Sequence, residues 1–382
     1  MKIFKLFTCL LSAVLLASCF SACKPTIDPY DLVVPDTALV LELKHQDDLT
    51  INVKTRGVSA TISVDGSLIM GSYDVADYKI TIPASKLSAY NGNIVNAKLT
   101  FFDKNEELVD SQNLTIDIVD RAISTADEFD AWYTDYMTYG EKPTENANLK
   151  SVISEHIILT ADLDLAKSYN NWGMAGWLTH LFTGTFDGRG HIIYGFSSAN
   201  GFIPNLGKTG VIKNLALVDM TTTGRNGFVG MFLCGTIENC YFQGEHTTTN
   251  PQYYSGFYFR YYNDQANPKY YAQKVSNVVI DVQRADFAIS YDAFFDSARD
   301  LKEYKGGKFV FGKPDVSVFD NVYMINNAYN GKVFNENGGF SDITMFDSVW
   351  DFAIEITELP DGFSDEYWEI SDDGLRFKGI KL

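Results

Sequence analysis

In the stretch FTGTFDGRGH, residues 182–191, an aspartate, an arginine and a histidine fall within five residues. Asp187, Arg189 and His191 stand at alternate positions among glycines, a composition shared by hydrolase turns and metal-binding loops. Acid catalysis here would need a second carboxylate, as in paired-acid enzymes. The upstream acids that could supply it are Asp162 and Asp164. The other interpretation, which we favour, is a structural turn, because glycine permits sharp corners and aspartate accepts a hydrogen bond from its own backbone.

A repeat further along the chain predicts the elements that position this turn. VIKNLALV, TIENCYFQ, KVSNVVID and VFDNVYMI share the pattern apolar, any residue, Asn, apolar, any residue, apolar. Their asparagines are Asn214, Asn239, Asn277 and Asn321. In a parallel β-coil each turn stacks about 4.8 Å above the last. A corner asparagine tolerates the left-handed backbone region, and its amide bonds the asparagines above and below.

We therefore predict an Asn ladder within a parallel β-helix over residues 121–382, with coils at about 151–345. Insertions leave from another corner of each coil, so the separation of the asparagines varies while the local pattern holds. Alternate apolar residues would fill the interior as one column. The alternative is a β-sandwich whose strands happen to share asparagines.

Three runs carry a resemblance to a known family: ILTADLDL (158–165), FTGTFDGRGHIIYGF (182–196) and GFVGMFLCGTIENCYFQG (227–244). Together with Trp172 they resemble the right-handed β-helix proteins with GLUG-type repeats, which are secreted or surface proteins of bacteria with a pectate-lyase-like fold. The resemblance covers about residues 124–382. It implies that the FDGRGH block belongs to an early coil. It also implies that residues 346–382 close the last coil, with Trp350 and Trp368 over the open end of the core.

A helix at residues 125–138 is predicted to cap the N-terminal end of the β-helix. Thr125 and Glu128 have the spacing of a capping box. An aromatic stripe follows at helical spacing, made of Phe129, Trp132, Tyr133, Tyr136 and Met137. Such a stripe could serve as a ligand shelf, but we favour core packing, since a lone amphipathic helix before a β-rich region suits a cap on an exposed sheet end.

The fold class predicted for the chain is all-β. Residues 19–36 contain three of the ten prolines and form a tether. Residues 37–120 alternate apolar and polar positions between turn signals, which favours an immunoglobulin-like β-sandwich. The right-handed parallel β-helix with its α-helical cap follows.

The first residues predict export. MKIFK and the apolar run LFTCLLSAVLLA form a signal peptide over residues 1–18. Leu16-Ala17-Ser18-Cys19 resembles the lipobox of bacterial lipoproteins, in which the Cys19 thiol carries the lipid anchor. Cys23 is a weaker second candidate, and a soluble secreted protein is the other interpretation. We expect a lipid-anchored protein of a bacterial cell envelope, at the cell surface or outer membrane.

The net charge and the cysteine content exclude several classes of partner and site. The formal charge is -18 and no basic run follows the leader, so nucleic acid is excluded as a partner. Beyond the leader and the lipidated position, the cysteines are Cys23, Cys234 and Cys240. Their odd number and spacing indicate neither a disulfide framework nor a zinc site. Pairing of Cys234 with Cys240 stays open.

The run QYYSGFYFRYYNDQANPKYY, residues 252–271, is the candidate ligand platform. In a strand, Tyr258 and Tyr262 face the opposite side from Phe257, Phe259 and Tyr261. Exposed tyrosine faces stack on sugar rings while their hydroxyls stay hydrated. Tyr258, Arg260 and Tyr262 are therefore a hypothetical glycan-binding site, and stacking between neighbouring coils is the other interpretation, which we favour.

Acids recur between the third and fourth repeats, at Asp281, Asp286, Asp292, Asp296 and Asp300, near Arg284 and Arg299. By resemblance to pectate-lyase-type enzymes, acids on successive coils could hold Ca²⁺ beside a basic residue. Their spacing matches no calcium loop, so a solvated acidic face is favoured. No hydrolase, metalloprotease or phosphate-binding motif is present, and we assign no catalytic residue, metal ligand or cofactor.

These observations predict a non-enzymatic adhesin, or a module that binds glycan or a surface protein. The alternative is a polysaccharide lyase or glycoside hydrolase that acts on extracellular polysaccharide, because the predicted fold hosts many such enzymes. A structural stalk component is the third interpretation.

Overall fold

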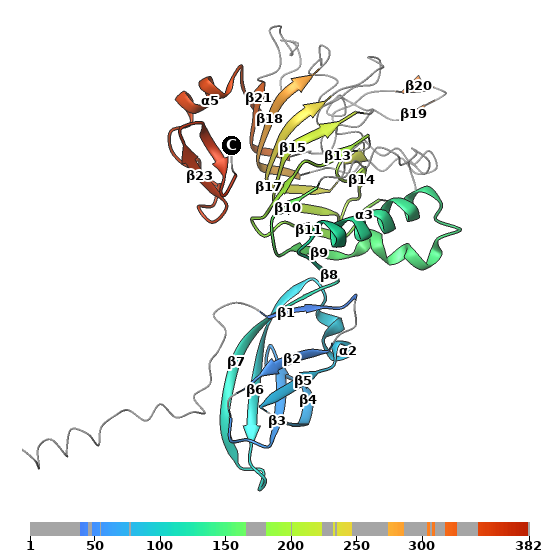
Figure 1. The fold of residues 1–382 in the computed structure, drawn as a ribbon, viewed down its shortest axis with the longest axis vertical. Helices are drawn as coiled ribbons and strands as arrows, with labels where there is room; N and C mark the ends of the chain where they lie inside the picture. The colour runs from blue at the N-terminus through green and yellow to red at the C-terminus, as the bar shows by residue number, and fades with distance from the viewer. Residues whose placement is uncertain are drawn as a thin grey trace, which may run out of the picture. The chain divides into compact units, whose positions relative to one another are not determined.

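The structure, a computed structural model, describes residues 39–44, 48–53, 55–75, 78–165, 181–199, 201–223, 232–233, 235–246, 274–285, 304–305, 308–309, 318–326 and 343–380. The prediction of a strand-rich chain is confirmed (Figure 1). The chain divides into two compact units between Ile118 and Val119.

The first unit has two sheets that share one core. Its five-stranded sheet has the order β1 (Leu39–Glu42), β7 (Leu108–Val119), β6 (Asn93–Phe102), β3 (Ser59–Val64), β4 (Ser67–Asp74). A second, two-stranded sheet joins β2 (Leu49–Asn52) to β5 (Lys79–Ile82), which α2 (Ala84–Leu87) and the 3₁₀ helix η1 (Ser88–Tyr90) follow. Burial alternates along β6, as expected where one face of a strand meets a core.

The second unit is built on a parallel sheet whose strands stack in chain order. The order is β8 (Arg121–Ile123), β9 (His156–Leu159), β11 (Thr185–Asp187), β15 (Val211–Thr222), β17 (Thr236–His246), β18 (Lys274–Ala285), β21 (Val318–Asn326), β22 (Ile343–Phe346). Shorter strands join beside them: β10 (Leu163–Asp164), β12 (Ile192–Tyr194) and β13 (Ser197–Ser198). Separate pairs form between β14 (Asn205–Leu206) and β16 (Phe232–Leu233), and between β19 (Tyr304–Lys305) and β20 (Lys308–Phe309).

Side chains at matched positions of these strands form columns. One interior column contains Leu215, Cys240, Val278 and Val322, and the next contains Leu217, Phe242, Ile280 and Met324. Between them, the outward-facing column contains Ala216, Tyr241, Val279 and Tyr323. Because side chains alternate in direction along a strand, one register aligns both the interior and the outer face.

Helix α3 (Ala126–Glu141) packs its aromatic stripe into this interior. The capping box of Thr125 and Glu128 is formed, with both reciprocal hydrogen bonds present. Trp132 is fully buried, and its ring centroid lies 5.2 Å from that of Phe186 on β11. The Tyr133 hydroxyl donates to the Gly201 carbonyl at 3.1 Å. The stripe is therefore core, and the ligand-shelf alternative is wrong. The 3₁₀ helix η2 (Ala147–Ser154) follows.

The C-terminal segment covers the outward face of the sheet. It contains α5 (Val349–Glu355) and a hairpin of β23 (Trp368–Ser371) and β24 (Gly374–Phe377). Its apolar residues form a second core with the outward column: Phe352, Phe363, Trp368, Leu375, Phe377 and Ile380.

Two expectations about this segment are corrected. It lies against the side of the parallel strands, because outward residues such as Tyr241 and Val279 need apolar cover, so it does not act simply as a lid on the last coil. Trp368 is 1% exposed, whereas Trp350 is 73% exposed and covers no core.

Candidate functional site

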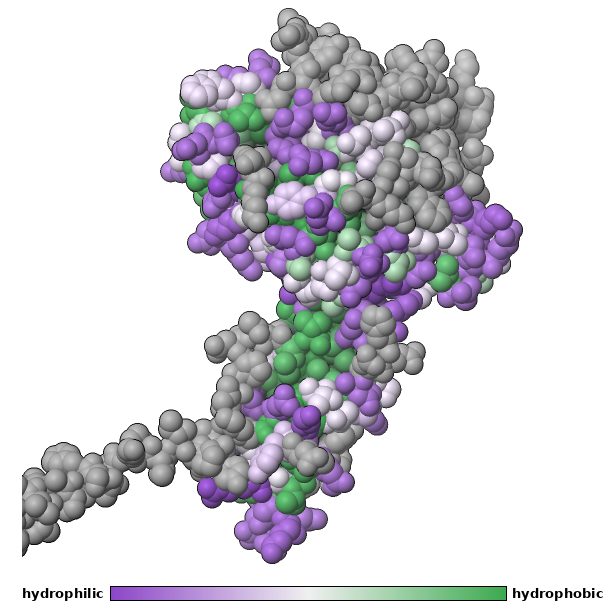
Figure 2. All heavy atoms as spheres, viewed as in Figure 1, coloured by the Kyte–Doolittle hydropathy of each residue, from purple (hydrophilic) through white to green (hydrophobic). Residues whose placement is uncertain are grey.

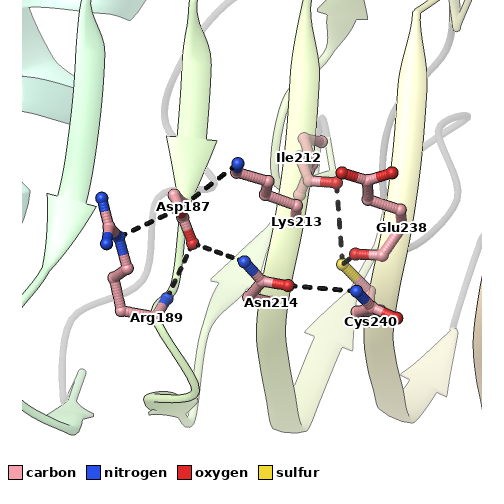
Figure 3. Close-up of polar contacts among 8 residues, drawn as sticks. Asp187, Arg189, Ile212, Lys213, Asn214, Glu238 and Cys240 are labelled. Carbon is pink, nitrogen blue, oxygen red and sulfur yellow. Dashed lines mark hydrogen bonds and ion pairs between the residues drawn. The ribbon is translucent and has the colours of Figure 1, made fainter. Parts of the chain in front are cut away.

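The FDGRGH turn lies at the end of β11, and its aspartate is buried. Asp187 is 5% exposed, and Figure 3 shows four groups converging on its carboxylate. Oδ1 accepts from the Arg189 backbone N–H at 3.0 Å and from Asn214 Nδ2 at 2.9 Å. Oδ2 lies 3.0 Å from Arg189 Nε and 3.5 Å from Lys213 Nζ. Both oxygens are committed, so Asp187 could act as a base only by releasing these partners.

Asp187 is the first member of a row of side-chain hydrogen bonds that crosses the sheet. Asn214 Oδ1 accepts from Asn239 Nδ2 at 3.2 Å (Figure 3). Asn239 Oδ1 accepts from Asn277 at 3.1 Å, and Asn277 Oδ1 from Asn321 at 3.1 Å. All four asparagines have left-handed backbones, with φ between 52° and 55°. The four predicted residues are thus brought together, one on each successive strand.

The sequence analysis did not predict that Asp187 extends the row of asparagines or that Lys213 pairs with Asp187. Asn214 aligns with Gly188, because Lys213 pairs with Asp187 in the register of β11 and β15. The coil that precedes Asn214 therefore has glycine at the asparagine position, and Asp187 reaches across to the ladder. The signal available in the sequence was the alignment of Phe186-Asp187-Gly188 with Ile212-Lys213-Asn214.

His191 contacts a different carboxylate. Its Nδ1 lies 3.2 Å from Asp162 Oδ1, which also accepts the Ile192 backbone N–H at 3.0 Å. Asp162 thus holds the start of β12 in place, while Asp164 is exposed on β10. The described contacts assign Asp162 and Asp187 to separate groups of partners, so the paired-acid interpretation gains no support.

Tyr367 from the C-terminal segment lies beside this turn. A Cβ added at Gly190 would lie 3.3 Å from Tyr367 Cδ1. Burial, reinforced by the neighbouring Glu366 carboxylate, raises the pKa of Tyr367 to about 12. Its hydroxyl is therefore a neutral phenol at physiological pH and serves as a hydrogen-bond donor, not a base.

The C-terminal segment also binds the far end of the ladder. Asn277 Nδ2 donates to the Gly362 carbonyl at 2.8 Å, and Asn321 Nδ2 donates to the Asp361 carbonyl at 2.6 Å. Each amide has two N–H groups, so these asparagines bond along the ladder and to the covering segment at once. The ladder is therefore a structural spine that also fixes the segment outside it.

For Asp281, one of the acids predicted to lie on a solvated face, the structure corrects the prediction. Asp281 is 2% exposed, and its Oδ2 accepts from Tyr241 Oη at 3.3 Å and Gln243 Nε2 at 3.2 Å. Gln283 Nε2 donates to the same oxygen at 2.5 Å. Burial, and then the Asp281 charge, raises the pKa of Tyr241. The Asp281 carboxylate is therefore a buried hydrogen-bond acceptor and not a solvated one. The residues next to Asp281 in the sequence do not indicate this burial.

Several predicted residues fall outside the described part of the chain: Cys19, Cys23, Trp172, Cys234, Tyr258, Arg260, Tyr262, Asp286, Asp292, Asp296, Arg299 and Asp300. Cys240 is described and is a free, buried thiol, and its burial raises the pKa of that thiol.

Within the described ranges, no group of three His, Cys, Asp or Glu residues is arranged to hold a metal ion. None of the described helices is long and apolar enough to cross a membrane.

The chain matches no family profile, no curated protein and no solved structure.

Proposed function

We propose that this protein is a lipid-anchored component of a bacterial cell surface that binds its ligand without transforming it. The anchor is the lipidated Cys19, which follows the leader at residues 1–18. The ligand is a glycan or a surface protein, and a glycan would stack on the platform of Tyr258, Arg260 and Tyr262.

We assign the two units to finer fold types on their packing. The first is an immunoglobulin-like β-sandwich, supported by two sheets that share one core and by the antiparallel pairs β3–β4, β3–β6, β6–β7 and β2–β5. The second is a right-handed parallel β-helix of the GLUG-repeat type. Stacked parallel strands whose residues stay aligned on both sides of an asparagine corner, present on four of them, support that assignment.

The observation that supports a binding function is that the polar side chains of the FDGRGH turn are used in structural hydrogen bonds. Asp187 bonds to its own turn and to the next strand, and Asp162 bonds to His191 and to β12. The residues whose types suggested a reaction centre therefore hold coils together. A stiff stack of this kind presents surface side chains at regular spacing, which suits recognition of an extended polymer.

The anchor is tested by replacing Cys19 with alanine. We expect the variant to lose incorporation of labelled palmitate and to leave the membrane fraction, because acyl chains supply about 0.8 kcal/mol per buried CH₂. The matched control is Cys23→Ala, which should keep both label and fractionation. Unchanged labelling of the Cys19 variant would refute this anchor position.

The binding function is tested on a glycan array with the full chain. Replacing Tyr258 and Tyr262 together with alanine should reduce retention at least tenfold, whereas Phe257→Leu should leave retention unchanged, since alternation in a strand would place Phe257 on the opposite side. The same preparations are incubated with acidic polysaccharides and assayed for reducing ends and unsaturated products. Turnover would replace the binding function with the lyase or hydrolase alternative.

A further inference from the structure

Helix α5 turns an apolar pair of side chains toward solvent. Trp350 is 73% exposed and Ile354 is 60% exposed, and residues four apart lie on the same side of a helix. The opposite side carries Phe352, which is 1% exposed and packs against Phe346 with ring centroids 4.9 Å apart. Phe352 thus anchors the helix to the core. Because Trp350 lies on the opposite side of the helix, this anchoring leaves Trp350 exposed to solvent.

The segment that carries this pair is acidic. Residues 343–375 contain no Lys, Arg or His and ten acids: Asp347, Asp351, Glu355, Glu358, Asp361, Asp365, Glu366, Glu369, Asp372 and Asp373. Asp351, Glu355 and Glu358 are exposed on or directly after α5. Figure 2 shows hydrophobic and hydrophilic residues side by side in the region of α5 and β23. We call Trp350, Asp351, Ile354, Glu355 and Glu358 the α5 face.

The exposed apolar side chains and the carboxylates of the α5 face together indicate which kind of partner could bind there. Carboxylates repel phosphate groups, so anionic lipid headgroups and nucleic acid are unfavourable occupants. Neutral sugars would use the tryptophan but not the charge. A lysine or arginine side chain can pair with the carboxylates and also lie over the tryptophan ring, which attracts cations through its π-system. Tryptophan is also among the residues that dominate binding at protein interfaces.

We propose that the α5 face binds a basic amphipathic segment of a partner protein. Its cationic side chains pair with Glu355 and Glu358 and cover Trp350, while its apolar side chains cover Ile354. This goes beyond the proposed function, because the α5 face is separate in sequence from the glycan platform and its chemistry specifies a cationic, amphipathic partner.

The test uses the full chain and a fluorescein-labelled peptide of leucine and lysine that forms an amphipathic helix, followed by fluorescence anisotropy. Trp350→Ala should weaken binding at least tenfold, and Glu355→Gln combined with Glu358→Gln should weaken it and flatten its dependence on salt. The matched control is Leu108→Ala, which removes an apolar side chain that is 67% exposed in the first unit. That variant should bind like the unmodified chain.

Three results would overturn the proposal. The first is equal binding of a peptide with glutamate in place of lysine. The second is loss of glycan retention, with peptide binding intact, in Trp350→Ala, which would assign the face to sugar. The third is a dimer, measured by light scattering, that Trp350→Ala dissociates, which would assign the face to a second copy. Intact glycan retention in Trp350→Ala keeps this test separate from that of the proposed function.

Discussion

Replacing Gly184 with alanine is expected to lower the free energy of unfolding of the second unit by about 3 kcal/mol or more, at the upper end for overpacking. Gly184 precedes β11, where the neighbouring coil passes close by. An added Cβ would overlap the carbonyl oxygen of Glu155 and lie 2.8 Å from the carbonyl carbon of Ser154. Both are backbone atoms, so no rotamer change relieves the overlap.

Urea unfolding followed by tryptophan fluorescence measures this effect, because all five tryptophans lie beyond residue 119. The matched control is Gly140→Ala in α3, where an added Cβ meets nothing within 4 Å. Alanine there should stabilise the unit by up to about 1 kcal/mol, the difference in helix propensity. Equal midpoints for the Gly184 variant and the unmodified chain would show that the two coils do not approach as closely as described.

Replacing Asn214 with alanine is expected to cost about 3 kcal/mol of stability, from two sources. The left-handed backbone at φ 52° is unfavourable for alanine by about 1–2 kcal/mol. Loss of the amide leaves Asp187 without one donor and Asn239 without its acceptor, and an unsatisfied buried partner costs about 1–3 kcal/mol.

Asn214→Gly separates the two sources, because glycine accepts the left-handed backbone but offers no amide. We expect it to be destabilising by about 1 kcal/mol less than alanine. The same urea titration measures both variants. If both variants unfold at the same urea concentration as the unmodified chain, the hydrogen bonds of Asn214 contribute no stability, and asparagine occupies this position for another reason.

The ladder was predictable because it rests on a local preference. Asparagine tolerates the left-handed corner, and Asn214, Asn239, Asn277 and Asn321 each carry that corner wherever their strands lie. The capping box before α3 and the helical spacing of its aromatic stripe are local in the same sense. Burial of that stripe followed from its being too apolar to face water.

Other features could not be predicted because they depend on which segments stack. Trp350 and Trp368 lie in one short aromatic-rich tail, yet one is exposed and the other buried. Asp281 shares an acidic stretch with residues expected at the surface, yet it accepts three side-chain hydrogen bonds under cover. Neither difference is encoded in the few residues around each position.

By itself, the sequence determined the periodicity of the strands, the corner residues, the helix start and the acidic character of the tail. Each depends on backbone preferences or composition within a few residues. Only the tertiary structure decided that Asp187 begins the ladder, that the C-terminal segment covers the outward face, and that α5 leaves Trp350 outside. These outcomes depend on long-range register, because a side chain's partner and its burial are set by the strand that stacks above it.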